Sequence, residues 1–226
     1  MLLLVDLDKT LVDRASAFNL WASDFVQSLG RSDSATAWLI AADRDGYESR
    51  ESLARAIEER FETGLGIEAL VEKLLYDHVG LMTLDSVTAA ALRNARKSGW
   101  RIGIVTNGTT AQQTLKIHTV GLEPYVDAVI ISETEGVRKP DTQLFEIAAR
   151  RLGSGVAGGW MVGNHPTADI SGGSAAGLRT GWVSRGKDWP IDIAAPDLSA
   201  ATAAEVIGAV VLSSTHKDHR QIPFVR

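Results

Sequence analysis

The sequence predicts an α/β fold, in which helices cover a parallel sheet and a helical bundle is inserted after the first strand. Short apolar, β-branched runs recur along the chain, and each suits one buried strand. Helical patterns separate most of these runs, so crossovers should join the strands and keep them parallel. One stretch, 15–81, has four helical patterns and no strand pattern, which predicts a separate helical bundle.

Each element follows from such a pattern. The first strand is expected at 2–5, and the inserted helices at 15–29, 34–43, 49–61 and 66–79. Later strands are expected at 101–105, 128–132, 159–162 and 180–183, and the helices among them at 85–98, 110–120, 141–152 and 168–176. We therefore predict a core domain of residues 1–14 and 82–226 and an inserted domain of residues 15–81. Residues 213–226 have no clear period and are interpreted as a surface extension.

Composition excludes several classes of protein. The 226 residues are 45% hydrophobic and 23% charged, which fits one globular domain with a sizeable insertion. The net charge of −5 argues against binding a nucleic acid polymer through a bulk basic surface. Because the chain has no cysteine, disulfides, thiolate zinc sites and cysteine nucleophiles are excluded.

We expect neither a signal peptide nor a membrane span. The apolar start, 1–5, is too short for a signal peptide, and no later run reaches the roughly 20 apolar residues of a membrane span. We expect a cytoplasmic protein with no membrane partner.

Asp6 and Asp8 follow the first expected strand. Alternate residues of an extended chain share a side, so two carboxylates should converge where this strand ends. Because such acids repel each other, a divalent cation between them is the natural relief. The alternative is a turn with two solvated aspartates, but the end of a first strand is a ligand-binding edge of parallel sheets.

Thr106, Asn107, Gly108 and Thr109 follow the second expected strand. A hydroxyl, an amide and backbone N–H groups beside a helix N-terminus make a suitable phosphate cradle. Taken alone, the segment could equally be a turn that caps the following helix.

Two further segments are notable for their order and spacing. Lys139 precedes a proline that presets the first turn of a helix, and taken alone such a Lys-Pro-Asp segment is most often a solvated helix start. Asn164 and Asp169 follow the strand expected at 159–162. His165 could be taken for a metal ligand, but a loop histidine beside a proline is more often structural or in contact with substrate.

These four segments resemble, in order, the motifs of the haloacid dehalogenase (HAD) superfamily. Residues 6–12, Asp-Leu-Asp-Lys-Thr-Leu-Val, match its first motif, hhhhDxDxT, and 104–109, 136–141 and 160–170 are similar to the other three. The resemblance covers nearly the whole chain and implies a Rossmann-like core with an inserted helical cap. Segments 106–113, 132–139 and 169–177 are loosely similar to the branch with pyrimidine 5′-nucleotidase-like members.

The resemblance implies a role for each site residue. Asp6 would be the nucleophile, Asp8 the general acid and base, and Lys139 the cation that neutralises the transferred group. Thr106, Asn107, Gly108 and Thr109 would bind the substrate. Mg²⁺ would be held by the Asp6 carboxylate, the Asp8 backbone carbonyl, Asp169 and Asn164. Asn164 departs from the family motif, which has aspartate there, so we expect weaker metal binding.

The resemblance implies magnesium-dependent hydrolysis of a small phosphomonoester, such as a phosphorylated metabolite or nucleotide, through an aspartyl-phosphate. The dehalogenases resemble the sequence less because they lack the second acid, here Asp8. Two alternatives stay open, namely a catalytically weakened binding or regulatory protein, as Asn164 permits, and a phosphotransferase or mutase. We expect a monomer or a homodimer.

Three aromatic residues in the insert allow two interpretations. Trp21, Trp38 and Tyr47 could stack on a ring of the substrate, but at helical spacing they are more often part of a bundle core.

Overall fold

The structure, a computed structural model, describes residues 1–218. The chain divides into two compact units. The first comprises Met1–Leu11, Leu84–Gln113 and the chain from Gly121 onward, and the second comprises Val12–Thr83 and Thr114–Val120.

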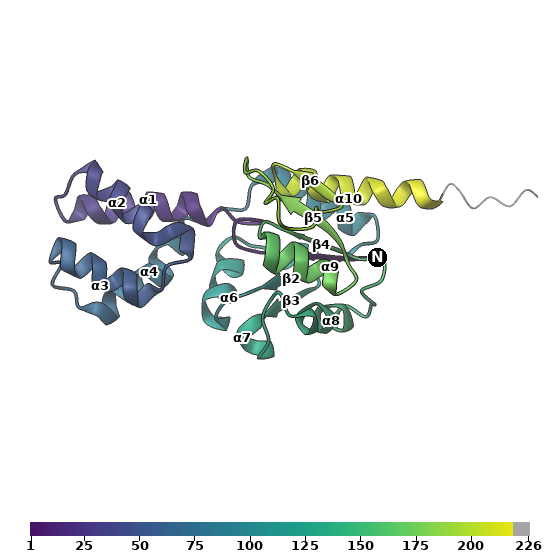
Figure 1. The fold of residues 1–226 in the computed structure, drawn as a ribbon, viewed down its shortest axis with the longest axis horizontal. Helices are drawn as coiled ribbons and strands as arrows, with labels where there is room; N and C mark the ends of the chain where they lie inside the picture. The colour runs from purple at the N-terminus through teal and green to yellow at the C-terminus, as the bar shows by residue number, and fades with distance from the viewer. Residues whose placement is uncertain (219–226) are drawn as a thin grey trace, which may run out of the picture. The chain divides into compact units, whose positions relative to one another are not determined.

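The first unit contains one sheet of six parallel strands, which confirms the predicted α/β fold (Figure 1). The strands lie in the order β3-β2-β1-β4-β5-β6, so β1 is flanked by β2 and β4. Their bounds are Leu2–Val5 for β1, Arg101–Thr106 for β2, Ala128–Ile131 for β3, Trp160–Gly163 for β4, Arg179–Val183 for β5 and Leu198–Ala200 for β6. The sequence did not predict β6, because this three-residue edge strand has no buried position.

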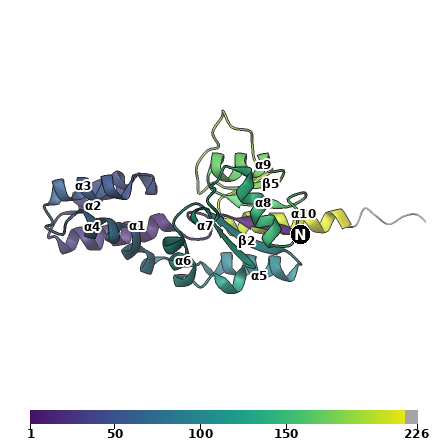
Figure 2. The ribbon, with the colours of Figure 1, turned by 90° about the horizontal axis from the view of Figure 1, so that it is seen from below.

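Helices cover both faces of this sheet. Figure 2 shows α9 on one side of the strands and α5 on the other; α8 packs against α9, and α10 packs against α5. The bounds are Ser86–Lys97 for α5, Thr110–Thr119 for α6, Ser132–Glu135 for α7, Thr142–Arg151 for α8, Gly172–Ala175 for α9 and Ala203–Asp218 for α10. A short 3₁₀ turn, Glu123–Tyr125, precedes β3. Aspartates cap two of these helices, because Asp85 accepts from the backbone of Thr88 and Asp141 from that of Gln143.

Two predictions for the later part of the chain are wrong in part. The helix expected at 168–176 is a π-helical turn, Pro166–Ser171, followed by α9, since the His165 carbonyl accepts from both Asp169 and Ile170. The surface extension expected at 213–226 is helical as far as Asp218, where α10 ends; 219–226 lie outside the described residues. The helix α10 starts within the core and buries four aliphatic residues at helical spacing, namely Val206, Ile207, Val210 and Val211.

The core of the first unit is a cluster of buried apolar side chains. Leu2 and Leu4 of β1 join Phe145 of α8 in one buried cluster. A Cβ at Gly181 of β5 would overlap Val206 of α10, so only glycine allows this helix to lie so close to the sheet.

The second unit comprises four helices of the inserted segment together with Thr114–Val120, which include most of α6. The four helices are α1 Arg14–Ser28, α2 Asp33–Asp43, α3 Arg50–Phe61 and α4 Ile67–Tyr76, with 3₁₀ turns at Arg44–Gly46 and Asp77–Leu81. The helix expected at 66–79 therefore ends at Tyr76. Trp21 is buried and stacks on Phe25, with their ring centroids 5.1 Å apart, and the half-buried Trp38 packs against the same core. Tyr47, by contrast, is 63% exposed.

A buried ionic cluster joins three segments of the second unit. Arg14 donates two hydrogen bonds of 2.9 Å to the two carboxylate oxygens of Asp43, and Arg50 donates a third at 2.8 Å. Burial alone would raise the pKa of Asp43, but the two guanidinium groups outweigh it and lower that pKa below its usual value.

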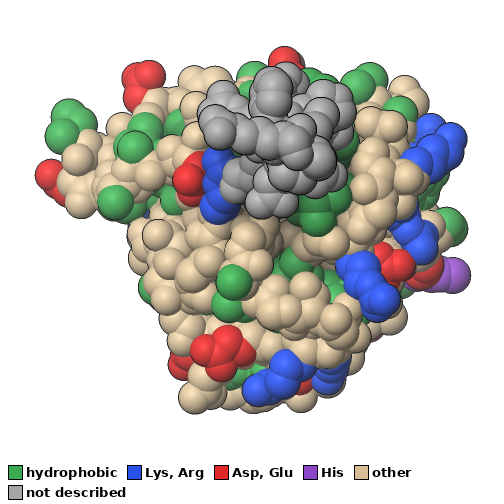
Figure 3. All heavy atoms as spheres, turned by 90° about the vertical axis from the view of Figure 1, so that its right-hand side faces the viewer, with side chains coloured by type: hydrophobic (Ala, Val, Ile, Leu, Met, Phe, Trp, Pro, Cys, Tyr) green, Lys and Arg blue, Asp and Glu red, His purple; other side chains and the backbone are tan. Residues whose placement is uncertain are grey.

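Two surface features bear on partners. In the part of the chain that the structure describes, no helix combines the length and the apolar character that a membrane crossing requires. Outside the atoms drawn in grey, the face in Figure 3 carries Lys and Arg side chains mainly toward its right-hand side, with acidic side chains among them.

Candidate active site

The order of the strands brings the predicted motifs together. Since β2, β1 and β4 are neighbours and parallel, their carboxyl ends lie at one edge of the sheet. Asp6 follows β1, Thr106 ends β2 and Asn164 follows β4. Asp6 extends the pairing by donating its backbone N–H to the Val162 carbonyl at 2.9 Å.

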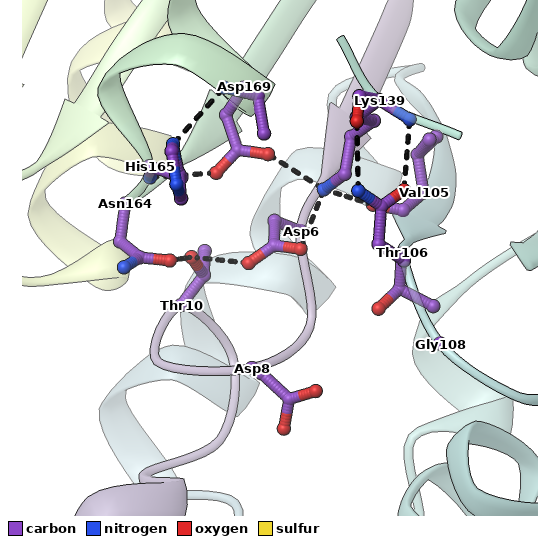
Figure 4. A network of polar contacts seen from close by, with 12 residues as sticks. Asp6, Asp8, Thr10, Val105, Thr106, Gly108, Lys139, Asn164, His165 and Asp169 are labelled. Atoms are coloured by element: carbon purple, nitrogen blue, oxygen red, sulfur yellow. Dashed lines mark hydrogen bonds and ion pairs between the residues drawn. The ribbon is translucent and has the colours of Figure 1, made fainter. Parts of the chain in front are cut away.

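Lys139 is the centre of this site (Figure 4). Its Nζ lies 2.7 Å from Oδ1 of Asp6 and 2.6 Å from Oδ1 of Asp169, and it also donates to the Val105 carbonyl at 2.8 Å. All three charged side chains are buried: Lys139 is 4% exposed, Asp6 7% and Asp169 1%. One buried cation therefore compensates two buried carboxylates.

Burial and the three neighbouring charges act in opposite directions on the pKa values of this site. Burial raises the pKa of Asp6 to about 7, and the nearby Asp169 and Asp8 carboxylates act in the same direction, while Lys139 opposes them. Burial alone would lower the pKa of Lys139, but the carboxylates of Asp169 and Asp6 raise it above its usual value. Lys139 is thus a permanent cation, and the nucleophilic group predicted at Asp6 sits next to it.

Thr10 links Asp6, the predicted nucleophile, to Asn164, the residue of the fourth motif that differs from the family pattern. Its hydroxyl lies 3.1 Å from Oδ2 of Asp6 and 3.4 Å from Oδ1 of Asn164. The Asn164 backbone carbonyl in turn accepts from Nε1 of Trp182 at 2.9 Å. Oxygens of Asp6 and Asn164 therefore face the same hydroxyl.

Asp169 uses both carboxylate oxygens within the protein. Oδ1 accepts from Lys139, and Oδ2 accepts from the His165 backbone N–H at 2.8 Å. A Cβ at Gly163 would overlap the Asp169 carboxylate, so the glycine that ends β4 makes room for this acid. Nδ1 of His165 accepts from the backbone N–H groups of Thr167 and Ala168, which is a capping role.

The segment predicted to cradle phosphate is tied to its surroundings. The Asn107 amide holds the Lys139 backbone through two hydrogen bonds, with Nδ2 donating to the carbonyl at 3.0 Å and Oδ1 accepting from the N–H at 2.9 Å. The Gly108 N–H donates to Oγ of Ser132 at 3.0 Å. Oγ1 of Thr109 accepts from the Gln112 backbone at 3.4 Å, as expected for a helix cap.

Gln113 is a buried site residue that sequence reasoning missed. The glutamine is 1% exposed, and its Nε2 lies 3.0 Å from Oδ2 of Asp8 and 2.5 Å from Oγ1 of Thr106. The available signal was weak, because a glutamine one helical turn inside α6 normally faces solvent.

The residues assigned to a metal provide hard oxygen donors. Asp6, Asn164, Asp169 and the Asp8 carbonyl would offer carboxylate, amide and backbone oxygens, which are the ligands that Mg²⁺ prefers. Among the side chains that the structure describes, no group of three or more His, Cys, Asp or Glu is arranged to hold a metal ion. The assigned set contains only two such side chains, Asp6 and Asp169, because its other two members are an amide and a backbone carbonyl. All four members are oxygen donors, so the set fits Mg²⁺ in its chemistry.

Several curated proteins are similar to part of this chain. Pyrimidine 5′-nucleotidase YjjG of Escherichia coli (strain K12) is 39% identical over 97 residues, or 42% of this chain and 43% of that protein. Phosphoserine phosphatase of Thermus thermophilus is 36% identical over 123 residues, or 54% and 49%. The chain thus spans about half the length of these relatives. Glyceraldehyde 3-phosphate phosphatase of Methanocaldococcus jannaschii is 27% identical over 203 residues, or 82% and 85%.

Solved structures share the fold. A HAD phosphatase from Thermococcus onnurineus has a TM-score of 0.63 at 24% identity, over 92% of this chain and 96% of that one. A 2-haloacid dehalogenase from Pseudomonas syringae has a TM-score of 0.62 at 24% identity, over 95% and 98%. Because a phosphatase and a dehalogenase match equally well, the fold does not choose between their reactions.

A family match completes these comparisons. Residues 1–177 match the family described as haloacid dehalogenase-like hydrolase. This range includes both predicted acids of the first motif, Lys139, and the whole segment from Asn164 to Asp169. The chain therefore belongs to the haloacid dehalogenase-like hydrolases.

Proposed function

We propose that this protein is a phosphatase that hydrolyses a small phosphomonoester, with Asp6 as nucleophile. The observation that carries the proposal is the buried contact of Asp6 with Lys139, at 2.7 Å, next to a second acid at Asp8. A carboxylate beside a fixed cation can attack phosphorus while the cation compensates charge on the transferred group. The named activities of the curated relatives, a nucleotidase and two phosphatases, support the same class.

The reaction would take two steps. First, an Asp6 oxygen attacks phosphorus, the bond from phosphorus to the ester oxygen breaks, and Asp8 gives its proton to the leaving alcohol. Then Asp8 accepts a proton from a water molecule, whose oxygen attacks the aspartyl-phosphate and releases inorganic phosphate. Asp6 and Asp8 thereby return to their starting states.

The proposed cofactor is Mg²⁺. Asp6, the Asp8 backbone carbonyl, Asn164 and Asp169 would hold it, and when bound it would supply positive charge to the phosphoryl oxygens. Lys139 supplies a second positive charge from the protein itself. Its bonds to Asp6, Asp169 and the Val105 carbonyl hold the ammonium group in one place.

The second acid favours phosphoryl transfer over carbon–halogen cleavage. A dehalogenase releases a halide ion, which needs no proton, whereas an alkoxide leaving group does need one. Asp8 is half-buried, and Oδ2 of its carboxylate accepts from Gln113. The acid is therefore held in place, which suits a residue that must meet a leaving oxygen.

We assign the substrate choice to the inserted helices, residues 15–81, as a cap. The assignment rests on the position of this insert directly after the first motif in the chain. A cap that covers bound substrate would exclude bulk water from the reaction.

A coupled pair of assays tests the proposed function. The purified protein should release phosphate from p-nitrophenyl phosphate when Mg²⁺ is present. This release should stop when the metal is chelated. A screen of nucleoside monophosphates, sugar phosphates and phosphoglycolate would then name the substrate, with free phosphate and phosphorylated acceptor measured separately. A phosphorylated acceptor as the main product would identify a phosphotransferase or mutase. No turnover of any ester with Mg²⁺ would favour a binding or regulatory protein instead.

A further inference from the structure

Gln113 of α6 connects the first two motifs. Its Nε2 lies 3.0 Å from Oδ2 of Asp8, 2.5 Å from Oγ1 of Thr106 and 3.5 Å from the carbonyl oxygen of Asn107. With 1% of its surface exposed, this amide cannot exchange these partners for bulk water.

The second motif is shaped around this side chain. A Cβ at Gly108 would lie 2.9 Å from both Cγ and Cδ of Gln113, so a larger residue at 108 would push the amide from its place. Gly108 also has a φ of +155°, a conformation that glycine adopts readily. The glycine thus allows the glutamine to reach Asp8.

Burying this amide has a cost that the local fold does not explain. Oε1 of Gln113 is buried without a hydrogen-bond partner, so it has lost its contact with water and gained no bond within the protein. A leucine or methionine would fill the same space in α6 without that cost. The presence of an amide at this buried position is best explained by its hydrogen bond from Nε2 to the Asp8 carboxylate.

The direction of the Asp8 side chain fits this view. Figure 4 shows the Asp8 carboxylate turned away from Asp6, on the side of the second motif. In an in-line displacement, the attacking oxygen and the leaving oxygen lie on opposite sides of phosphorus. An acid that serves the leaving oxygen must therefore stand away from the nucleophile, with room for the phosphoryl group between them.

We propose that Gln113 is a positioning residue, which holds the Asp8 carboxylate through Nε2 in the orientation that reaches the leaving oxygen. The inference rests on the proposed function of Asp6 and Asp8. Without the amide, Asp8 would rotate about its side-chain bonds and spend less time near the leaving oxygen. The loss should then grow as the leaving group becomes poorer, because a poor leaving group depends more on its proton donor.

The test compares two aryl esters of similar size, p-nitrophenyl phosphate and phenyl phosphate, at saturating Mg²⁺. Phenolate is the poorer leaving group of the two. For Gln113→Met, kcat/KM with phenyl phosphate should fall by roughly tenfold to a hundredfold, and that with p-nitrophenyl phosphate by about threefold or less. Gln112→Met, at the neighbouring half-buried position, is the matched control and should leave the ratio of the two rates unchanged.

A double-mutant cycle separates positioning from a general structural effect. In an Asp8→Asn background, Gln113→Met should have little further effect on the ratio, because the group that it positions is gone. Equal losses on both esters, or a loss of the same size in the Asp8→Asn background, would overturn the inference. If Gln113→Met does not fold, Gln113→Asn serves instead, since its shorter amide cannot span the distance to Asp8.

The same experiment distinguishes this inference from the proposed function. If the wild-type protein hydrolyses both esters and Gln113→Met does not change the ratio of the two rates, only the role of Gln113 is contradicted. Wild-type protein that hydrolyses neither ester removes the proposed function, and the role of Gln113 falls with it.

Discussion

Asn107 and Lys139 hold each other through a pair of hydrogen bonds, 3.0 Å and 2.9 Å long, between the amide of one and the backbone of the other. The amide was predicted to bind substrate, but in the structure it fixes the segment that carries the site's cation. Lys139 then extends its Nζ to Asp6 and Asp169. The second motif thereby sets the place of the third.

Replacing Asp6 by asparagine should abolish turnover, because an amide cannot form the covalent intermediate at phosphorus. We expect a loss of roughly 10³-fold or more in kcat for p-nitrophenyl phosphate. Asp8→Asn should also be severely impaired, yet an activated ester should still phosphorylate Asp6. Mass spectrometry of the quenched protein would detect that phosphorylation.

Asp24→Asn is the matched control for Asp6→Asn, because Asp24 is an exposed aspartate on α1. Its activity should equal that of the wild type. Turnover by Asp6→Asn within about tenfold of the wild type would remove Asp6 from the role of nucleophile.

Lys139→Met should inactivate and destabilise the protein. The change leaves the buried carboxylates of Asp6 and Asp169 without their cation, which costs about 3–5 kcal/mol. Loss of Lys139 should raise the pKa of Asp6 above its present value of about 7. A carboxyl with a raised folded-state pKa binds protons that the unfolded chain has released, so stability falls as pH rises through that pKa.

Urea denaturation of the metal-free protein between pH 5 and pH 8 would measure this effect. The gap in unfolding free energy between wild type and Lys139→Met should widen toward pH 8. Lys97→Met removes an exposed lysine on α5 and should show no such trend. A gap that stays constant or narrows with rising pH would contradict the proposed pairing.

The fold was largely predictable, because its strands are buried on both faces. Such strands are continuous apolar runs, as in 2–5 and 101–105, and they stand out in the sequence. The edge strand β6 is short and half-exposed, so no pattern marks it. The π-helical turn at Pro166–Ser171 was also beyond prediction, because one carbonyl takes two donors there, which periodicity does not record.

The sequence identified the residues that meet at the site, but their contacts depend on the fold. Asp6, Lys139 and Asp169 are far apart in the chain, and the strand order brings them within hydrogen-bonding distance. Sequence reasoning could not tell that Asp169 would use both oxygens within the protein. It also could not find Gln113, since burial of a glutamine depends on its neighbours in space.

Acid should weaken the second unit through Asp43. Because the folded-state pKa of Asp43 lies below its ordinary value of 3.8, its carboxylate contributes stability above that pH, and the contribution is lost as pH falls through the folded-state pKa. Asp43→Asn leaves the buried Arg14 without a charged partner and should cost about 3 kcal/mol at pH 7. The difference from wild type should shrink below about pH 4, as the wild-type carboxyl is protonated. Tryptophan fluorescence in urea would measure this difference in unfolding free energy, because Trp21 and Trp38 lie in this unit. A difference that does not depend on pH would contradict the role of Asp43.

Two aromatic residues of the insert should behave differently. Trp21→Ala should destabilise the second unit by about 3–5 kcal/mol, because the ring is buried against Phe25. Tyr47→Ala should leave stability nearly unchanged and alter the ratio of kcat/KM values among phosphate esters, and neither change should remove the magnesium requirement. Leu20→Ala, at another exposed position of the insert, is the control. If Tyr47→Ala abolished the metal requirement and kept the substrate preference, the insert would not be the part that selects substrate.

The last prediction concerns Asn164, where the family motif has aspartate. Its Oδ1 lies 3.4 Å from the Thr10 hydroxyl that also contacts Asp6, so a carboxylate at this position would add negative charge beside Asp6. Asn164→Asp should therefore tighten magnesium binding by direct attraction. Activity at limiting Mg²⁺ should rise, while activity at saturating Mg²⁺ should change little, because the wild-type site is then already filled.

A magnesium titration of activity in wild type and Asn164→Asp would check this expectation. Asn94→Asp is the matched control, since it adds the same charge at an exposed position of α5 and should not shift the titration. An unchanged or weaker apparent affinity in Asn164→Asp would place Asn164 outside the metal site. The proposed ligands would then be reduced to Asp6, the Asp8 carbonyl and Asp169, and the added charge would instead repel the incoming phosphate.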